Sequence, residues 1–471
     1  MCSSIITGVA LVNVKQKCTE SALKKIIINF KNHNTMKKTK EVLFTGSDTE
    51  GGITSGYQMN DGVPLKVPYS FFGSIYDEDE ERAVKIAMAQ ESQTMGPQVT
   101  LFQREFAKIF EVKHALAASN CTTAMHAATQ AFGIGKGDEV IVTPNTFIAT
   151  SLVILKEGAK PVYADIDPRT FNIDPKQIED KITSKTKAIY VVHYAGQMCD
   201  MDPIMKIAKK HKLFVLEDCA HAAGSKYKGR PAGSIGDVGC FSFHSLKNIT
   251  TLGEGGMITT NNDDLAEKLQ RMRVMSITHW DPNQTRFEFG GFKMEKKSVK
   301  DYWLPSHFDV IDDNGKWGCN YRMNESQAAV GRAQLRKLDM LINRRRENSH
   351  YLNEGMKKIK GVREVYEDPN CYHAFHLYTL LIKEKELGGS RDNFMRVLYQ
   401  EEGIQGIQHY QPNYHFTGLK KMYHYPDKLC PVAENFFYNE HTSLPMNPRL
   451  TREDLDMIIE GVRNAAMKLR K

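Results

Sequence analysis

The 471-residue sequence predicts an α/β protein with a mostly parallel seven-stranded sheet and a smaller C-terminal α/β domain. Three observations predict this fold. Seven short apolar runs between residues 114 and 260 have the length of strands, and helical stretches separate several of them. A long helical pattern follows from residue 325, and the chain then alternates more loosely. Hydrophobic residues make up 41% and charged residues 25%, as expected of a soluble globular protein.

The expected elements follow one another in a regular order. The expected strands are residues 114–119, 138–144, 161–166, 187–196, 213–218, 237–243 and 255–260. The expected helices are residues 77–90, 96–110, 122–132, 147–158, 201–211, 325–352 and 452–471. Because strands that alternate with helices are joined by crossovers, we expect the sheet to be largely parallel. Residues 255–260 are placed where a strand could return antiparallel.

Composition divides the chain into three regions. Residues 1–65 are basic and then rich in Gly, Ser and Thr, which predicts a poorly ordered N-terminal extension or a start placed too early, with Met36 as a second start. Residues 66–330 are expected to form a large domain and residues 331–471 a small one. Residues 279–318 form a long irregular stretch that is rich in aromatic and charged side chains.

The net charge of +7 resides in the N-terminal region. Residues 1–40 contain eight lysines and one acidic residue, and the remaining chain has 55 basic and 55 acidic residues. The body of the protein is therefore neutral, which argues against a nucleic-acid surface.

Cysteine usage and hydropathy indicate a cytoplasmic protein. The nine cysteines are scattered without a C-x-x-C pair, which favours reduced thiols over disulfides or a structural zinc site, so we expect no metal. No apolar run approaches the roughly 18 residues that a membrane span needs.

A single lysine stands out in "CFSFHSLKNITTLGEGG" (240–256). Lys247 lies between an apolar run and a glycine-rich turn. Asp218, in "LEDCAHAAG", ends another apolar run, and ligands of parallel α/β sheets bind beyond such strand ends. Asp218 is also a reasonable helix N-cap, and this alternative stays open.

Three further sequence features each allow a purely structural and a ligand-binding interpretation. The helix that starts in "SNCTT" (119–123) presents Cys121, Thr122 and Thr123, which either bind a phosphate or only cap the helix. Phe147 follows a strand end and either stacks on a flat ligand or packs in the core. Asn320 stands near the entry to a long helix, where most asparagines cap or turn the chain.

Together these pieces predict a site for pyridoxal 5′-phosphate. That cofactor requires a lysine for a Schiff base, an acid for its pyridinium nitrogen, and donors for its phosphate. A desolvated lysine amine has a lowered pKa, attacks an aldehyde, and can then carry a proton as base and acid in turn.

The ordered motifs resemble those of the DegT/DnrJ/StrS sugar aminotransferases, which belong to fold type I of the pyridoxal-phosphate enzymes. The resemblance covers about residues 66–471. Motifs that carry it are "SNCTTAMHAA" (119–128), "GDEVIVTPNTFIAT" (137–150), "LEDCAHAAGSKYKGR" (216–230), "GDVGCFSFHSLKNIT" (236–250) and "CNYRMNESQAAVG" (319–331).

The resemblance implies a role for each site residue. Lys247 and Asp218 are the catalytic residues: the lysine binds the cofactor covalently, and the aspartate pairs with the pyridine nitrogen. The other residues implied in cofactor binding are Cys121, Thr122, Thr123 and Ser242 at the phosphate, Phe147 on the ring, His221 near the ring hydroxyl, and Asn320 from the other subunit. The resemblance thus implies a homodimer with shared active sites.

The implied reaction is transamination from glutamate or glutamine to a keto sugar, nucleotide-linked, with pyridoxamine 5′-phosphate formed during turnover. Related enzymes that remove a sugar hydroxyl have histidine in place of the lysine, so Lys247 argues for transamination. Two alternatives stay open: a relative acting on a ketocyclitol or an aminohydroxybenzoate precursor, and a non-enzymatic regulatory protein that binds the cofactor.

The sequence departs from the family pattern in three places. Leu252 is an extra residue, for which we expect a local bulge without loss of the chemistry. Residues 279–318 are long for the family, and residues 1–65 have no counterpart in it. By family position, residues 279–318 and "HYQPNYHF" (409–416) are expected to help form the substrate site.

Overall fold

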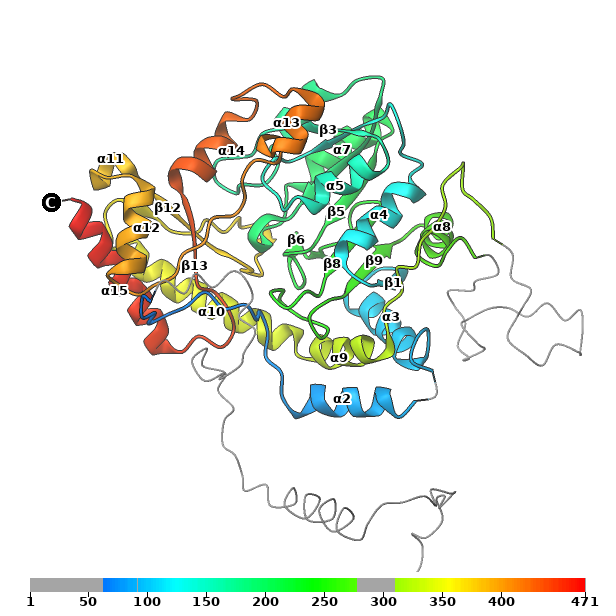
Figure 1. Ribbon diagram of the computed structural model, residues 1–471, viewed down its shortest axis with the longest axis horizontal. Helices are drawn as coiled ribbons and strands as arrows, with labels where there is room; N and C mark the ends of the chain where they lie inside the picture. Colours follow the sequence, from blue (N-terminus) through cyan, green and yellow to red (C-terminus); the bar gives the residue numbers. More distant parts are fainter. Residues whose placement is uncertain (1–61, 91, 278–309, 471) are drawn as a thin grey trace, which may run out of the picture. The chain divides into compact units, whose positions relative to one another are not determined.

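The computed structural model describes residues 62–90, 92–277 and 310–470. The first 61 residues of the predicted extension, and residues 278–309 of the predicted irregular stretch, lie outside the described residues. From residue 62 onward the described residues belong to one unit (Figure 1).

All seven predicted strands form one sheet. They are β1 (His114–Ala118), β2 (Glu139–Val142), β3 (Lys160–Tyr163), β4 (Thr186–Val192), β5 (Phe214–Asp218), β8 (Val238–Ser242) and β9 (Gly256–Thr260). The strand order is β1-β9-β8-β5-β4-β2-β3. Neighbours from β8 to β3 run parallel, whereas β9 is antiparallel to both β8 and β1. The predicted mostly parallel sheet and its antiparallel return strand are therefore confirmed.

Helices cover both faces of this sheet, so its strands are apolar on both sides (Figure 1). In β4, Tyr190 belongs to one core cluster, while Ile189 and Val191 belong to the other. The first cluster includes residues of α4 (Cys121–Ala131), α5 (Ala149–Lys156) and α8 (Asp263–Arg273). The second includes residues of α3 (Pro97–Ile109), α7 (Met201–His211), α9 (Glu325–Arg336) and the start of α10 (Leu338–Met356).

The helix predicted over 325–352 is interrupted at Lys337, which ends α9 and precedes α10. The backbone N–H of Lys337 donates to the carbonyls of Gln334 and Leu335. Its ammonium group reaches across to Asp77 and Glu80 at the start of α2 (Glu78–Met88), at 2.6 and 2.7 Å. The helical pattern predicted over 325–352 is therefore two helices, and the ion pairs of Lys337 lie at the break between them.

A second sheet belongs to the C-terminal part of the chain. Strands β10 (Val362–Arg363), β12 (Tyr378–Ile382) and β13 (His441–Leu444) pair antiparallel in the order β10-β12-β13. A separate apolar core joins them to α10, α12 (Arg391–Gln400) and α15 (Arg452–Leu469). A small third sheet, in the order β11-β6-β7, contains β6 (Lys226–Tyr227), β7 (Arg230–Pro231) and β11 (Cys371–Tyr372).

The remaining described elements are short. They are α6 (Pro175–Ile178), α11 (Glu384–Leu387), α13 (Thr417–Tyr423), α14 (Pro431–Asn435), η1 (Glu179–Lys181), η2 (Tyr194–Gly196), η4 (Asn413–His415) and η5 (Phe436–Glu440).

Strand β4 ends four residues before the predicted limit of 196. Ala195 and Gly196 have φ values of 58° and 94°, which turn the chain away from the sheet. The Ala195 N–H donates to His221 Nδ1 at 3.3 Å, and its carbonyl accepts from the His376 N–H at 2.8 Å. These tertiary contacts stop an apolar run that looked like one strand.

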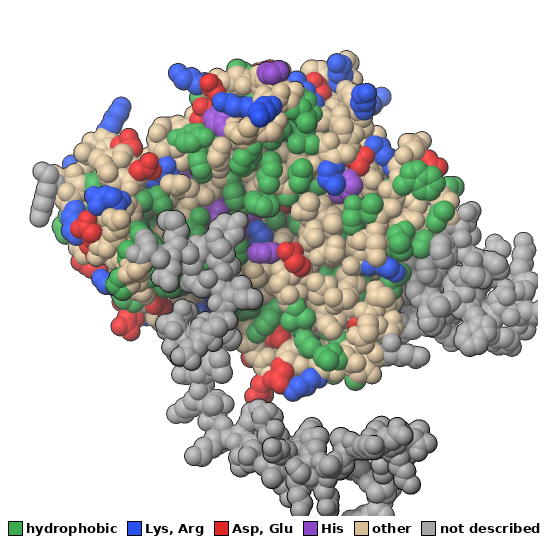
Figure 2. All heavy atoms as spheres, in the orientation of Figure 1, with side chains coloured by type: hydrophobic (Ala, Val, Ile, Leu, Met, Phe, Trp, Pro, Cys, Tyr) green, Lys and Arg blue, Asp and Glu red, His purple; other side chains and the backbone are tan. Residues whose placement is uncertain are grey.

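The surface of the described residues carries both acidic and basic side chains. Acidic and basic side chains are interspersed on the face shown in Figure 2. Among the described residues, no helix has both the length and the apolar character required to cross a membrane.

Candidate active site around Lys247

Lys247 lies in the loop that joins β8 to β9. Its backbone N–H donates to the carbonyl of His244 at 2.8 Å, which makes a tight turn. Burial lowers the pKa of the amine to about 8, although the nearby Asp218, Cys121 and Glu254 act to raise it. The lowered pKa favours the unprotonated amine, which is the form that acts as a nucleophile and as a base.

Asp218 ends β5 at the carboxyl edge of the parallel strands and is 4% exposed. Its Oδ2 accepts a hydrogen bond from Thr150 Oγ1 at 2.8 Å, and its Oδ1 accepts from the Ala220 N–H at 3.1 Å. Burial raises the pKa of this carboxyl group, and Thr150, Ala220 and Lys247 oppose the rise. The sheet thus brings the two predicted catalytic residues within electrostatic reach of each other.

The start of α4 lies beside Asp218. Cys121 Sγ is 4.0 Å from Asp218 Oδ1 and 3.5 Å from the Cys240 carbonyl. Asn120 caps the helix by accepting from the Thr123 N–H at 2.9 Å, and Thr123 Oγ1 accepts from the Asn120 N–H at 3.2 Å. Ordinary capping is therefore present at Asn120 and Thr123. The Thr122 hydroxyl makes no hydrogen bond with any described residue, so it remains available to a ligand.

Phe147 follows β2 and is 59% exposed, so its interpretation as a core residue was wrong. Its ring contacts Tyr410 edge to face, with centroids 6.1 Å apart. Asn413 fixes this neighbouring segment, because its Nδ2 donates to the Thr146 carbonyl at 2.7 Å and its N–H donates to the Pro144 carbonyl at 3.1 Å. Residues 409–416 therefore lie along the same strand end as Phe147.

His221 is 5% exposed and carries its proton on Nε2, since Nδ1 accepts from the Ala195 N–H. Nε2 then donates to Tyr410 Oη at 3.2 Å. The ring of His376 lies 4.2 Å away. Burial and the positive charge of Lys247 hold the pKa of both histidines well below the ordinary range, and the same causes lower the pKa of His409 to about 3. This group of histidines is therefore neutral beside the lysine.

Ser242 and Asn320 differ in their surroundings. Ser242 ends β8, is 8% exposed, and accepts from the His244 N–H at 3.3 Å. Asn320 is exposed, and its Oδ1 accepts from Arg322 Nε at 2.9 Å. No hydrogen bond between described residues joins Asn320 to the other predicted residues.

Two residues of this site were not predicted, Thr150, whose hydroxyl donates to Asp218, and His376, whereas Tyr410 belongs to the segment 409–416 that was expected to help form the substrate site. Thr150 and Tyr410 lie within stretches that were singled out, "PNTFIAT" and "HYQPNYHF", whereas His376 has no local sequence signal. The extra residue Leu252 is 47% exposed at a turn with φ 57°, where its N–H binds Tyr76 Oη at 2.9 Å.

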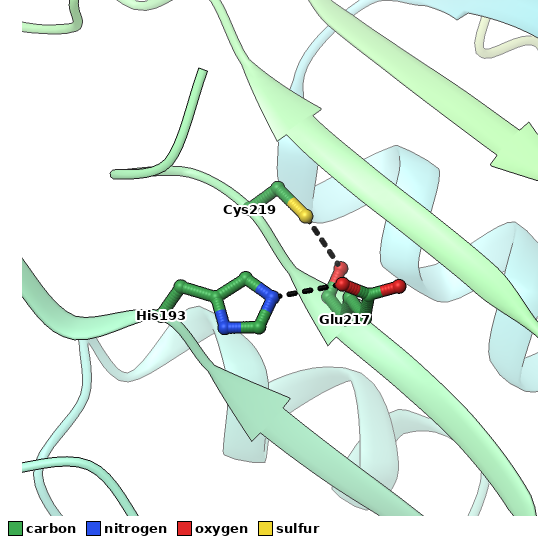
Figure 3. A group of neighbouring side chains, drawn as sticks. All are labelled: His193, Glu217 and Cys219. Atoms are coloured by element: carbon green, nitrogen blue, oxygen red, sulfur yellow. Dashed lines mark hydrogen bonds and ion pairs between the residues drawn. The ribbon is translucent and has the colours of Figure 1, made fainter. Parts of the chain in front are cut away.

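His193, Glu217 and Cys219 form a second buried group with potential metal ligands (Figure 3). His193 Nε2 donates to Glu217 at 2.9 Å, and His193 Nδ1 accepts from the Cys199 N–H at 3.1 Å. The Glu217 carboxylate also accepts three backbone hydrogen bonds, from Gly233, Ile235 and Gly236. Because the ring nitrogens and both carboxylate oxygens are already engaged, we interpret this group as structural.

Comparison with known proteins finds relatives that match over most of the chain. Spore coat polysaccharide biosynthesis protein SpsC of Bacillus subtilis is 38% identical over 405 residues, which are 84% of this chain and 96% of that protein. GDP-perosamine synthase of Caulobacter vibrioides is 38% identical over 371 residues, covering 78% of this chain and 90% of that protein.

Solved structures of aminotransferases also match this chain over most of its length. The Helicobacter pylori aminotransferase PseC, involved in the biosynthesis of pseudoaminic acid, is 28% identical with a TM-score of 0.74, and the match covers 85% of this chain and 99% of PseC. The sugar aminotransferase Spr1654 of Streptococcus pneumoniae in its PLP form is 26% identical with a TM-score of 0.72, covering 85% of this chain and 99% of that one.

Residues 74–463 match the DegT/DnrJ/EryC1/StrS aminotransferase family. The predicted fold type I and the predicted enzyme class, an aminotransferase, are thereby confirmed. Since the match spans most of the sequence, the chain belongs to the DegT/DnrJ/EryC1/StrS aminotransferase family.

Proposed function

We propose that this protein transfers an amino group from glutamate or glutamine to a nucleotide-linked keto sugar and so makes an amino sugar. The similarity to GDP-perosamine synthase and to PseC supports a sugar as the amino acceptor. The observation that carries the proposal is a buried lysine amine of lowered pKa within electrostatic reach of a buried carboxylate at the carboxyl edge of the sheet.

The residues at this edge fit pyridoxal 5′-phosphate, which the family and the PLP form of a structural neighbour also support. Asp218 is buried, and besides Thr150 and one backbone N–H its oxygens have room to accept from a pyridinium nitrogen. The Thr122 hydroxyl and the start of α4 can hold a phosphate, as can Ser242 at the end of β8. Phe147 offers an exposed ring for stacking.

The proposed chemistry follows from these residues. The bound cofactor supplies an electron sink for the pair released when the Cα–H bond of the amino donor breaks. The Lys247 amine would remove that proton from Cα as a base and, as an acid, deliver it to the C4′ carbon of the cofactor. Asp218 holds a proton on the ring nitrogen, and the Nε2–H of neutral His221 is directed toward Tyr410 beside the site.

The assembly and its place in the cell are part of the proposal. The large domain, residues 66–330, carries the lysine and the aspartate, and the small domain, residues 331–471, supplies the 409–416 segment. We propose a cytoplasmic homodimer in which Asn320 of each subunit reaches the cofactor phosphate of its partner. The exposed position of Asn320 supports this arrangement.

A labelled-donor experiment tests the proposed substrates. The purified protein is incubated with glutamate or glutamine carrying ¹⁵N at the α-amino group and with a panel of nucleotide-linked keto sugars. We expect one ketone to gain a labelled amino group by mass spectrometry, and Lys247→Ala to give none. Amination of a ketocyclitol alone would replace the sugar assignment, and no product from any ketone or donor would favour the regulatory alternative.

A further inference from the structure

Arg345 is a buried cation whose contacts are all uncharged. It lies on α10 and is fully buried. Its guanidinium donates to the carbonyls of Phe375, His376 and Met446 at 3.2–3.4 Å and to that of Gly73. Among the described residues, Arg345 hydrogen-bonds only to backbone carbonyls and forms no ion pair. Burying an unpaired charge is costly, so a residue of this kind needs an explanation.

The first contact of Arg345 leads to one side of Lys247. Gly73, whose carbonyl accepts from Arg345, donates its own N–H to the carbonyl of Ser245 at 2.8 Å. The backbones approach so closely that a Cβ on Gly73 would lie 2.1 Å from the Leu246 oxygen and 2.4 Å from the Lys247 oxygen. This segment therefore packs directly on the backbone of the lysine loop.

The second contact of Arg345, with the His376 carbonyl, leads to the other side of Lys247. The His376 carbonyl accepts from Arg345, and its ring Nδ1 is 3.1 Å from Asn248 Oδ1. Asn248 Nδ2 donates to the Ala223 carbonyl at 3.2 Å, so Oδ1 is the atom that accepts from the histidine. Asn248 is the residue directly after Lys247.

We propose that Arg345 is a positioning residue for Lys247. A single guanidinium fixes Gly73 and the His376 backbone, and these two groups hold the residues on either side of the lysine, Ser245 and Asn248. The guanidinium of arginine presents five N–H donors in a rigid planar fork, whereas a lysine ammonium has three donors on a flexible stem, so a lysine at this position should hold these carbonyls less firmly. The inference rests on the proposed role of Lys247, and it names what keeps that amine in its buried position.

The amine itself reports the position of the loop. Its pKa is near 8 because the loop keeps it from water, so a loosened loop moves that pKa toward the ordinary value of about 10.4. The titratable groups that interact electrostatically with it are Asp218, Cys121, Glu254, His221, His244, His376 and His409. None of these groups is changed in the variants below.

The test measures the amine without cofactor or substrate. The full-length protein is freed of bound carbonyl compounds with hydroxylamine and labelled with trace acetic anhydride between pH 6 and 11. Mass spectrometry of the peptide that contains Lys247 gives the pKa of its amine. We expect Arg345→Lys to raise that pKa by about one unit. Arg346→Lys is the matched control, because Arg346 is the next residue of α10 and binds Glu367 and the His373 carbonyl instead.

Gly73→Ala provides a second route to the same outcome if Arg345→Lys does not fold. The added methyl group would clash with the Leu246 and Lys247 carbonyl oxygens, so the contact between this segment and the lysine loop must open, and the pKa of Lys247 should rise here too. Gly418→Ala is its control, since a Cβ there meets no atom within 4 Å. A folded Arg345→Lys or Gly73→Ala protein with an unchanged Lys247 pKa overturns the proposal. Because the readout needs no turnover, that result is distinct from a failure of the aminotransferase assignment.

Discussion

At the scale of single residues, the site depends on two groups whose ordinary ionisation is altered by burial. The pKa of Lys247 is lowered and that of Asp218 is raised, and each group partly offsets the shift of the other. These two residues were predictable, because one stands in a glycine-rich loop and the other at the end of an apolar run. Thr150, Arg345 and His376 were not, because they act through contacts with residues far away in the sequence.

Asp218→Asn tests the role of the carboxylate. The amide keeps the shape and the bond to Thr150, but it cannot hold a proton on the ring nitrogen by its charge. We expect the cofactor to bind and kcat to fall by about 10²-fold or more. Asp237→Asn is the control, since the Asp237 carboxylate accepts from the Val215 N–H at 2.7 Å away from the site. An unchanged kcat in Asp218→Asn would remove this residue from the mechanism.

At the scale of elements, two adjacent threonines at the start of α4 have different roles. Thr123 caps the helix, and we expect Thr122 to bind the cofactor phosphate. The Thr123 hydroxyl is engaged in the cap, whereas that of Thr122 is available. We expect Thr122→Val to weaken the affinity for pyridoxal phosphate by about tenfold, as loss of one hydrogen bond would, without a change in Tm. Thr123→Val should lower Tm through the cap.

Titration of each variant with pyridoxal phosphate, together with thermal unfolding, checks this pair. If Thr122→Val binds the cofactor as tightly as the native protein, the phosphate is held elsewhere.

Glu217 joins β5 to the loop before β8 and is expected to stabilise the fold, not to bind a metal. Burial acts to raise the pKa of Glu217, but His193 and the backbone N–H groups of Gly236 and Gly233 outweigh it and hold that pKa below its ordinary value. Its contribution is therefore present above about pH 4.3 and is lost as the pH falls through the lowered pKa. Glu217→Ala should cost about 3–5 kcal/mol of unfolding free energy at pH 7, because it leaves His193 and the N–H groups unpaired.

Urea unfolding at pH 7 and at acidic pH measures this contribution. Exposure to EDTA or to Zn²⁺ should leave Tm of the native protein unchanged. A Tm that rises with Zn²⁺ and falls with EDTA would show instead that the group binds a metal.

The elements themselves were largely predictable, since strands that are buried on both faces are continuous apolar runs and all seven strands were found. The residues at which these elements begin and end were less predictable. At the end of β4, Ala195 contacts His376, and at the break between α9 and α10, Lys337 contacts Asp77 and Glu80 at the start of α2. Neither contact leaves a periodic pattern in the local sequence.

At the scale of the whole molecule, the central expectation is that two subunits share each active site. A mixture of Lys247→Ala and Asn320→Ala proteins tests it. In a mixed dimer, one site combines the native lysine of one subunit with the native asparagine of the other. After unfolding and refolding an equal mixture, we expect about a quarter of native activity, since half of the dimers then carry one native site of two.

Each variant refolded alone is the control for that mixture. Activity of the mixture equal to the mean of the two separate variants would place Asn320 in the site of its own chain, or outside the site altogether.

The most direct measurement of the central claim is the absorbance spectrum of the purified protein with pyridoxal phosphate, before and after addition of glutamate or glutamine. The account predicts a visible band from lysine-bound cofactor that one of the donors converts to the pyridoxamine form, and no such band in Lys247→Ala. A native protein that shows no band, or a Lys247→Ala protein that shows the band and transaminates, would contradict the assignment of Lys247.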